Sequence, residues 1–192
     1  MKKSDWQEKV AAIFKTKVPL IDEEVGALLK PWRSLKLKRN DFLVSNGDVE
    51  QHVYYVIRGS MRICYPKGKE EICVGFAYDG NLICSFPSFV RQKPSEHFIQ
   101  ALSATELVAM ERKDFYTLFD AHPKIERAWR QLEEEALIGM IEREAELLTF
   151  TPEQRYSRLM KRSPHLFQII PKKFIASYLR MSPETLSRIK LS

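Results

Sequence analysis

Hydrophobic residues recur at helical spacing near both ends of the chain and at strand spacing between them. In residues 6–17 and 22–32 the apolar side chains lie three or four positions apart, which predicts two packing helices. Between residues 35 and 110 the pattern changes to short runs rich in β-branched and aromatic residues, separated by Gly, Pro and Asn turns. Such short, regular strands predict an antiparallel sandwich or roll and not a sheet with helical crossovers. The strands that we expect are residues 35–38, 42–44, 53–57, 61–65, 71–78, 82–84, 98–101 and 106–110, with a turn at 66–69.

After the strands, the pattern predicts a short helix at 113–119 and then a long amphipathic helix. From Ile125 to Leu148 the apolar residues recur at three- and four-residue steps. A helix of about 25 residues makes about seven turns, more than a small domain needs for its own core. We therefore expect a second copy of the chain to cover part of the apolar face. This dimer interface would comprise Trp129, Leu132, Ala136, Leu137, Met140 and Ile141. The alternative is that the helix packs along its own chain.

The last part of the chain, residues 149–192, predicts a small helical head. Thr151-Pro152 ends the long helix and caps the next one. Pro171 opens a further helix, and Ser182-Pro183-Glu184 combines an N-cap, a proline in the first turn and an acidic residue. Two short helices joined by a three- or four-residue turn form a helix-turn-helix unit. A helical hairpin that only caps a core is the alternative.

Positive charge is concentrated in this head. From Thr149 onward there are nine Lys or Arg residues against two acids, whereas the rest of the chain is close to neutral. This distribution is expected of a phosphate-binding head on a neutral body. On the last helix, Glu184, Ser187 and Arg188 lie opposite the apolar positions and can reach base edges in a major groove. We expect DNA contacts from Lys172, Lys173, Arg180, Glu184, Thr185, Ser187, Arg188 and Lys190.

Composition sets the broad class of protein. A chain of 192 residues with 44% hydrophobic residues can bury one good core or two small ones. No apolar run approaches the roughly 18 residues that would span a bilayer, and no segment of signal-peptide character follows the N-terminus. We therefore expect a cytoplasmic protein with no membrane partner.

The cysteines and histidines do not form a metal-binding motif. No C-x-x-C pair occurs among the three cysteines, Cys64, Cys73 and Cys84. The four histidines are scattered, without an H-x-H pair. Because their neighbours are apolar, we expect the three cysteines to behave as small hydrophobic residues. A redox or metal role would require the fold to bring the thiols together. No metal site or catalytic residue is predicted.

The order of these segments resembles the Crp/Fnr family of bacterial transcription regulators along nearly the whole chain. Residues 53–62 are similar to the family's V-Y-x-V-x-x-G-x-V-x strand-turn-strand, and residues 79–83 to the turn that enters its ligand pocket. Residues 182–189 are similar to its recognition helix, with a Glu, a Ser and an Arg in E-x-x-S-R spacing.

This resemblance implies an α+β fold. An antiparallel β-roll of the jelly-roll or double-stranded β-helix type, with flanking helices, would occupy residues 1–121. A dimerisation helix would follow at 122–148 and the helix-turn-helix domain at 149–192. The sequence ends a few residues after Arg188, without the β-hairpin wing that often follows in the family. Arg180 occupies the turn where the family usually has glycine.

The function implied is that of a homodimeric, sequence-specific DNA-binding transcription regulator and not an enzyme. Its partners would be palindromic double-stranded DNA, a second copy of the chain and RNA polymerase. By resemblance, Glu184 accepts from a cytosine amino group, Arg188 donates to a guanine and Ser187 is an adaptable contact, as their side-chain chemistry also suggests. Two alternatives remain. One is a ligand- or protein-binding roll with a nonspecific basic tail. The other is a cupin-type enzyme, whose clustered histidines are not found here.

The expected effector pocket departs from the family's cyclic-nucleotide site. The Gly-Glu and Arg-Ser pairs that hold ribose and phosphate correspond here to Cys84-Ser85 and Ser95-Glu96. No arginine is then expected to face a phosphate, Glu96 would repel it, and Cys84 would crowd the ligand. We therefore expect no binding of cyclic AMP and no resident cofactor. These four residues, with Phe86 and His97, would line a remodelled pocket; a filled-in core is the alternative. The absence of cysteine from residues 1–40 argues against an iron–sulfur sensor.

Overall fold

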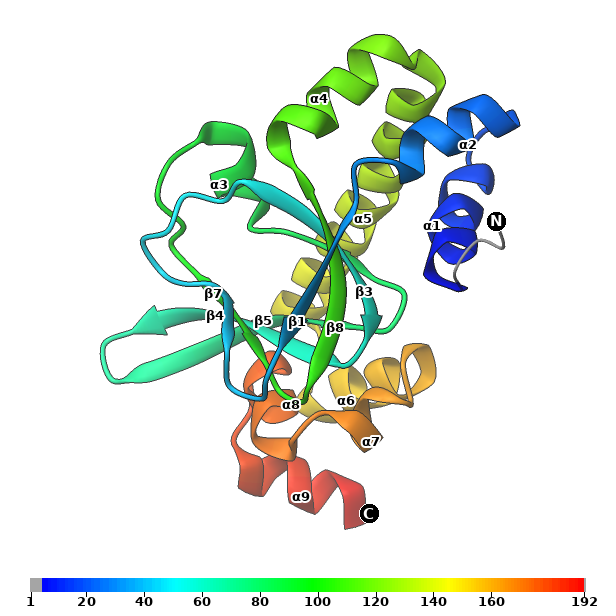
Figure 1. Cartoon of the computed structure of the whole chain (residues 1–192). Coiled ribbons are helices and arrows are strands. Elements are labelled where there is room, and N and C mark those ends of the chain that lie inside the picture. Colours follow the sequence, from blue (N-terminus) through cyan, green and yellow to red (C-terminus); the bar gives the residue numbers. More distant parts are fainter. Residues whose placement is uncertain (1–4, 192) are drawn as a thin grey trace.

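The computed structural model describes residues 5–191, with side chains as far as Ile189. Two four-stranded antiparallel sheets pack face to face as a roll, with helices at both ends (Figure 1). The first sheet has the strand order β1-β8-β3-β6 and the second β2-β7-β4-β5. The strands are β1 Arg33–Leu37, β2 Phe42–Val44, β3 His52–Arg58, β4 Ser60–Lys67, β5 Glu70–Tyr78, β6 Leu82–Ile83, β7 Phe98–Ala101 and β8 Thr105–Glu111. The predicted antiparallel roll is confirmed.

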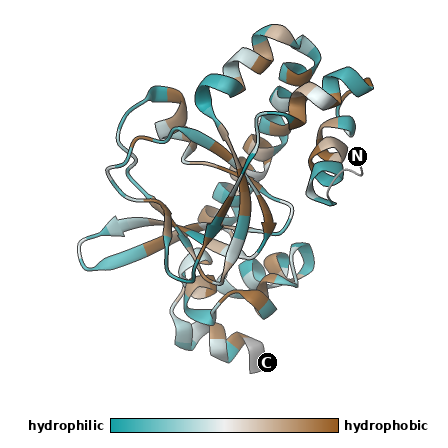
Figure 2. Cartoon of the chain, in the orientation of Figure 1, coloured by the Kyte–Doolittle hydropathy of each residue, from teal (hydrophilic) through white to brown (hydrophobic). Residues whose placement is uncertain are grey.

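The two central strands of the first sheet, β3 and β8, are buried on both faces. On β3, Tyr54 and Val56 face the second sheet, whereas Val53 and Tyr55 pack beneath the helices. The side chains of β8 alternate in the same way: Leu107 faces the second sheet, and Val108 packs beneath the helices. Figure 2 shows hydrophobic residues along the strands at the centre of the roll. A strand buried on both faces needs a continuous apolar run, which explains the sequence of residues 53–57.

The β4–β5 hairpin is longer than the sequence pattern predicted. Pro66 and Lys67, expected in a turn, belong to β4 and lie opposite Glu71 and Glu70. Strand β4 pairs with β7 only as far as Cys64, so the far side of Pro66 has no ladder neighbour. A proline is tolerated there because no backbone N–H is required on that side.

Most helices lie where the hydrophobic pattern placed them. Two short helices, α3 and α7, were not predicted. The helices are α1 Asp5–Lys15, α2 Asp22–Leu29, α3 Phe86–Arg91, α4 Arg112–Ala121, α5 Pro123–Thr149, α6 Pro152–Arg162, α7 Leu166–Ile169, α8 Lys172–Tyr178 and α9 Pro183–Leu191.

The head formed by α6 to α9 has a core of its own. Thr151 caps α6 in a reciprocal box with Gln154, as the Thr-Pro pattern predicted for the N-cap. On α5, Glu146 is buried and pairs with Arg158 and Arg162 of α6. The core residues of the head are Leu159, Leu166, Ile170, Ile175, Ala176, Leu179 and Leu186.

The head also rests on the outer face of the second sheet. The backbone N–H of Cys73 on β5 donates to Ser177 Oγ on α8 at 3.0 Å. From α5, Arg143 donates to the carbonyl of Tyr178 at 3.2 Å and lies 4.3 Å from the centre of its ring. The head is therefore held by both the long helix and the roll.

Candidate functional site

The predicted helix-turn-helix unit corresponds to α8, a short turn and α9. Ser182 caps α9 by accepting from the backbone N–H of Thr185 at 3.1 Å, as predicted. Leu186 is buried in the head core and Ile189 is half-buried. This anchors one side of α9 and turns the other side to solvent.

The turn contains a residue with left-handed backbone. Arg180 has φ of 55°, at the position where glycine was expected from the resemblance. The conformation costs about 1 kcal/mol more for arginine than for glycine. Arg155 of α6 compensates by donating to the carbonyls of Leu179 at 2.9 Å and of Arg180 at 3.3 Å. The turn is thus pinned by a side chain from outside the unit.

Most of the residues predicted to contact DNA are exposed on α8, the turn and α9. Thr185 is half-buried, and its hydroxyl lies 3.2 Å from Ser182 Oγ, so it takes part in the cap. The side chain of Lys190 lies outside the described residues. The exposed members are Lys172, Lys173, Arg180, Glu184, Ser187 and Arg188.

Glu184 is prepared to act as an acceptor. A hydrogen bond from Ser182 lowers the pKa of its carboxyl group, helped by the local backbone and the positive charge of Arg188. An ionised carboxylate can accept from an exocyclic amino group in a major groove.

Not all of the positive charge counted from the sequence is available to DNA. Arg155 binds carbonyls of the turn, and Arg158 and Arg162, although partly exposed, pair with the buried carboxylate of Glu146. The residues free for phosphate contacts are therefore fewer than the charge count indicated, and they are concentrated on the helix-turn-helix unit.

The long helix divides the predicted dimer stripe in two. Trp129 packs edge-to-face on the ring of Phe115 and at a tilt against that of Phe119, and Leu132 packs on the same intrachain core. Both residues are half-buried against the chain's own core, and their place in a dimer interface stays a prediction. Further along α5, Ala136 is exposed. The large apolar residues left exposed on α5 are Leu137 (57%), Ile138 (56%), Met140 (69%), Ile141 (58%) and Leu148 (79%). Ile138 and Leu148 were not among the residues predicted for the dimer interface.

A polar hollow lies beside α3, where the effector pocket was predicted. The Oγ atoms of Ser85 and Ser95 lie 2.8 Å apart, and His97 and Glu96 share the lining. Two predicted residues do not line it: Cys84 packs on the core beneath the helices, and Phe86 is largely exposed. The volume of the hollow is about 210 Å³.

The expectation that no arginine faces this pocket was wrong. Arg91 and Lys93 line it, together with Tyr65 and Ser88. Arg91 is the last residue of α3, and because the sequence pattern did not predict this helix, the position of Arg91 could not be inferred. The hollow therefore carries two cationic side chains and one acidic one, Glu96, at its edge.

Glu50 is buried beneath the hollow and was missed by the sequence analysis. Its Oε1 accepts from the backbone N–H of His52 at 3.0 Å and from the hydroxyl of Tyr54 at 3.1 Å. Its Oε2 accepts from the backbone N–H of Ser85 at 3.1 Å. Burial raises the pKa of Glu50, and these three hydrogen bonds oppose the rise. Glu50 therefore ties the start of α3 to β3.

We expect Glu50→Gln to destabilise the protein. Glutamine offers one acceptor oxygen where the structure uses two, so a buried N–H or O–H loses its partner at a cost of about 1–3 kcal/mol. Urea denaturation measures this loss. Glu96→Gln is the matched control, since Glu96 is exposed, and its effect should stay within about 0.5 kcal/mol. Equal stability of the two variants would show that Glu50 is not a structural anchor.

Comparison with known proteins supports the architecture. Residues 34–122 match the cyclic nucleotide-binding domain family. The catabolite activator protein of Thermus thermophilus is 24% identical over 91% of this chain and 84% of its own, with a TM-score of 0.59. The c-di-GMP-responsive regulator CLP of Xanthomonas campestris is 18% identical over 89% of this chain and 91% of its own, with a TM-score of 0.67. FixK2 of Bradyrhizobium japonicum is 14% identical over 83% of this chain and 83% of its own, with a TM-score of 0.69. No sequence among curated proteins matches the chain significantly.

These neighbours are regulators of the Crp/Fnr type, and the chain shares their fold. The resemblance inferred from the sequence is confirmed for the cyclic nucleotide-binding-type roll. Within residues 5–191, no helix is long and apolar enough to cross a membrane.

Proposed function

We propose that this protein is a homodimeric, sequence-specific DNA-binding transcription regulator of the Crp/Fnr type. The observation that carries the proposal is the exposed face of α9, where Glu184, Ser187 and Arg188 stand opposite the buried Leu186. A helix anchored on one side and polar on the other fits a major groove. The fold shared with known regulators supports the same conclusion.

The side chains of the unit divide into two roles. Arg188 donates two hydrogen bonds to a guanine, Glu184 accepts from a cytosine amino group, and Ser187 adapts to the base that it meets. Lys172, at the first position of α8, contacts phosphate, as do Lys173 and Arg180. Base contacts determine sequence, whereas phosphate contacts determine overall affinity and salt dependence.

A second copy of the chain covers the exposed stripe on α5. Four large apolar side chains within five positions of one helix, all more than half exposed, form a patch that a partner is expected to bury. A parallel pair of such helices places two heads side by side, and two half-sites about 34–36 Å apart, one turn of DNA, would meet both recognition helices.

The roll of this regulator does not bind cyclic AMP. The hollow beside α3 measures about 210 Å³, below the roughly 300–1,000 Å³ typical of small-molecule sites. Ser85 and Ser95 are buried and hydrogen-bond to each other, so they are not directed at a ligand phosphate. Calorimetric titration with cyclic AMP should therefore give no binding heat in the millimolar range.

Salt-dependent DNA binding by Lys172→Ala tests the proposed division of roles. We expect weaker binding to cognate and random duplexes alike, and a slope of log K against log salt that is smaller by about one unit. Fluorescence anisotropy at several salt concentrations measures both. Lys113→Ala, which removes an exposed lysine from α4, is the matched control and should leave the slope unchanged. Equal effects of the two substitutions would contradict a phosphate-binding head.

A further inference from the structure

Two of the three cysteines lie directly opposite each other on neighbouring strands. In the β4–β5 ladder Cys64 faces Cys73, because the register shifts after Ile63, which faces Gly75. Opposed residues of an antiparallel ladder have Cα atoms about 4.5–5.5 Å apart, within the roughly 4.4–6.8 Å that a disulfide requires. The third cysteine, Cys84, packs on the core beneath the helices. The fold therefore brings together a thiol pair that the sequence spacing did not indicate.

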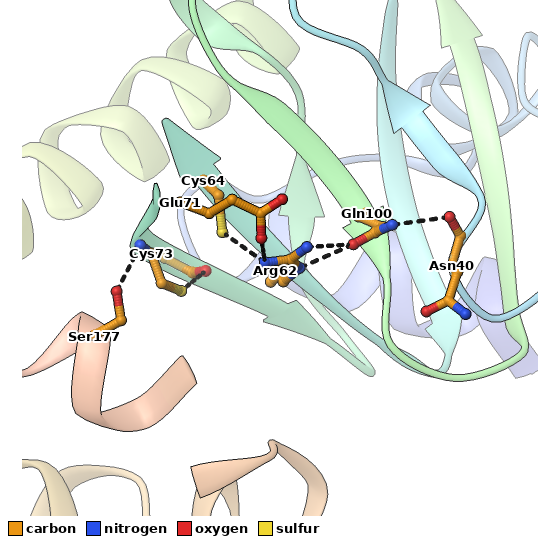
Figure 3. Close-up of polar contacts among 8 residues, drawn as sticks. Asn40, Arg62, Cys64, Glu71, Cys73, Gln100 and Ser177 are labelled. Carbon is orange, nitrogen blue, oxygen red and sulfur yellow. Dashed lines mark hydrogen bonds and ion pairs between the residues drawn. The ribbon is translucent and has the colours of Figure 1, made fainter. Parts of the chain in front are cut away.

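The pair lies beside a buried guanidinium group (Figure 3). Arg62 Nη1 lies 3.6 Å from Cys64 Sγ and also binds the carboxylate of Glu71. Gln100 Oε1 accepts from Arg62 Nη2 at 2.6 Å and from Nε at 2.9 Å. These contacts fix the guanidinium next to the Cys64 sulfur, where its charge stabilises a thiolate.

The two thiols differ in how readily they lose a proton. A hydrogen bond from the Cys73 thiol lowers the pKa of Cys64, and the charge of Arg62 lowers it further, against the opposing effect of burial. The pKa of Cys73 is raised by the same hydrogen bond and by burial. Burial also raises the pKa of Cys84. Cys64 is therefore the more acidic thiol of the pair.

Helix α8 of the head covers the pair. Cys64 and Cys73 are 0% and 1% exposed, although they are on the outer face of the roll. Phe174 and Tyr178 pack over the cluster, and the ring centre of Phe174 lies 4.3 Å from the Arg62 guanidinium carbon. Ser177 accepts the backbone N–H of Cys73. An oxidant in solution can reach the sulfurs only when α8 lifts away from the second sheet.

We propose that Cys64 and Cys73 are a thiol–disulfide modification site, shielded by α8 and oxidised by a small hydroperoxide when the head undocks. The Cys64 thiolate attacks hydrogen peroxide, the O–O bond breaks, and Cys64 becomes a sulfenic acid while hydroxide leaves. The Cys73 sulfur then attacks the Cys64 sulfur and forms the S–S bond. The sulfenic hydroxyl leaves with the Cys73 proton as water. Two thiols and one peroxide give one disulfide and two waters, and both electrons pass from sulfur to peroxide oxygen.

Peptide mapping after peroxide treatment tests the chemistry directly. The full-length protein is treated with hydrogen peroxide, alkylated and digested without reduction. We expect a peptide pair joined through Cys64 and Cys73, sensitive to a dithiol reductant, with Cys84 alkylated as a free thiol. Cys64→Ser should abolish the linked peptide and leave Cys73 free. Oxidation confined to Cys84, bridges only between chains, or thiols that all remain free would overturn the proposal.

Alkylation rates test the shielding by α8. Phe174→Ala removes a ring that covers the pair, and we expect Cys64 and Cys73 to react about tenfold faster with iodoacetamide, corresponding to about 1.4 kcal/mol of opening free energy. Phe42→Ala is the matched control, because Phe42 packs on Phe98 of the same sheet and belongs to β2, not to the head. In Phe42→Ala, the alkylation rates of Cys64 and Cys73 should stay within about twofold of those in the wild type. Equal acceleration in both variants, or none in Phe174→Ala, would show that α8 does not gate the site. This result is independent of whether the head binds DNA.

Discussion

Leu137→Lys converts the dimer that we propose into monomers. Leu137 is in the exposed stripe of α5, so the substitution leaves the roll and its core intact. In a symmetric dimer it occurs twice, and each copy loses about 1.5–3 kcal/mol of apolar burial. The dissociation constant should therefore rise by roughly a hundredfold or more. Sedimentation velocity at micromolar concentration would show the change in mass.

Val90→Lys is the matched control for this experiment. Val90 is also an exposed aliphatic residue, but it belongs to α3, far along the chain from the long helix. This variant should sediment like the wild type. Binding of a palindromic duplex should also weaken in Leu137→Lys and not in Val90→Lys, because a monomer meets one half-site only. A Leu137→Lys protein that remains dimeric would place the self-association surface elsewhere.

Arg188→Ala should have the largest effect on sequence recognition. A bidentate arginine–guanine contact is worth about 1–3 kcal/mol, and a dimer makes it in both half-sites, so affinity for a cognate palindrome should fall by about 30-fold or more. Affinity for random DNA should fall much less, because each chain loses only one positive charge that lies near the DNA phosphates. Competition titration of cognate against random duplex gives the ratio.

Arg39→Ala separates recognition from charge. Arg39 is an exposed arginine of the roll, next to β2, and its removal changes the net charge by the same amount. The cognate-to-random ratio should be unchanged in this variant. If Arg188→Ala and Arg39→Ala lower the ratio equally, Arg188 does not read a base.

Local sequence signals were sufficient for much of the fold. The caps at Thr151 and Ser182 were predicted from single short motifs, because capping depends on residues three positions apart. Strands were predicted for the same reason, since alternation and turn residues act locally. The exposed face of α9 followed from helical periodicity once its cap was known.

Features that depend on long-range contacts were missed. Helix α3 has six residues and begins Phe86-Pro87, a sequence that does not favour a helix by itself. Its Ser88 hydroxyl donates to the Lys93 carbonyl and accepts the backbone N–H of Glu50, 38 residues away, so the fold holds it in place. The pocket position of Arg91 depends on this helix and was missed with it.

The thiol pair and the divided face of α5 were unpredictable for similar reasons. Cys64 and Cys73 meet only because β5 has one extra residue, Val74, at the register shift. On α5, the apolar periodicity is continuous, yet Trp129 is covered by α4 whereas Met140 extends beyond it. Periodicity identifies an apolar face, but the neighbours that cover each part of it are set by tertiary packing.

Selection from a pool of random duplex DNA by the ligand-free protein tests sequence-specific binding most directly. We predict enrichment of a palindrome with a G·C pair in each half-site, and loss of that enrichment in Arg188→Ala with general DNA affinity retained. A pool that stays random after repeated selection, with binding that varies only with salt concentration, would contradict sequence-specific recognition and leave a basic surface that attracts any polyanion.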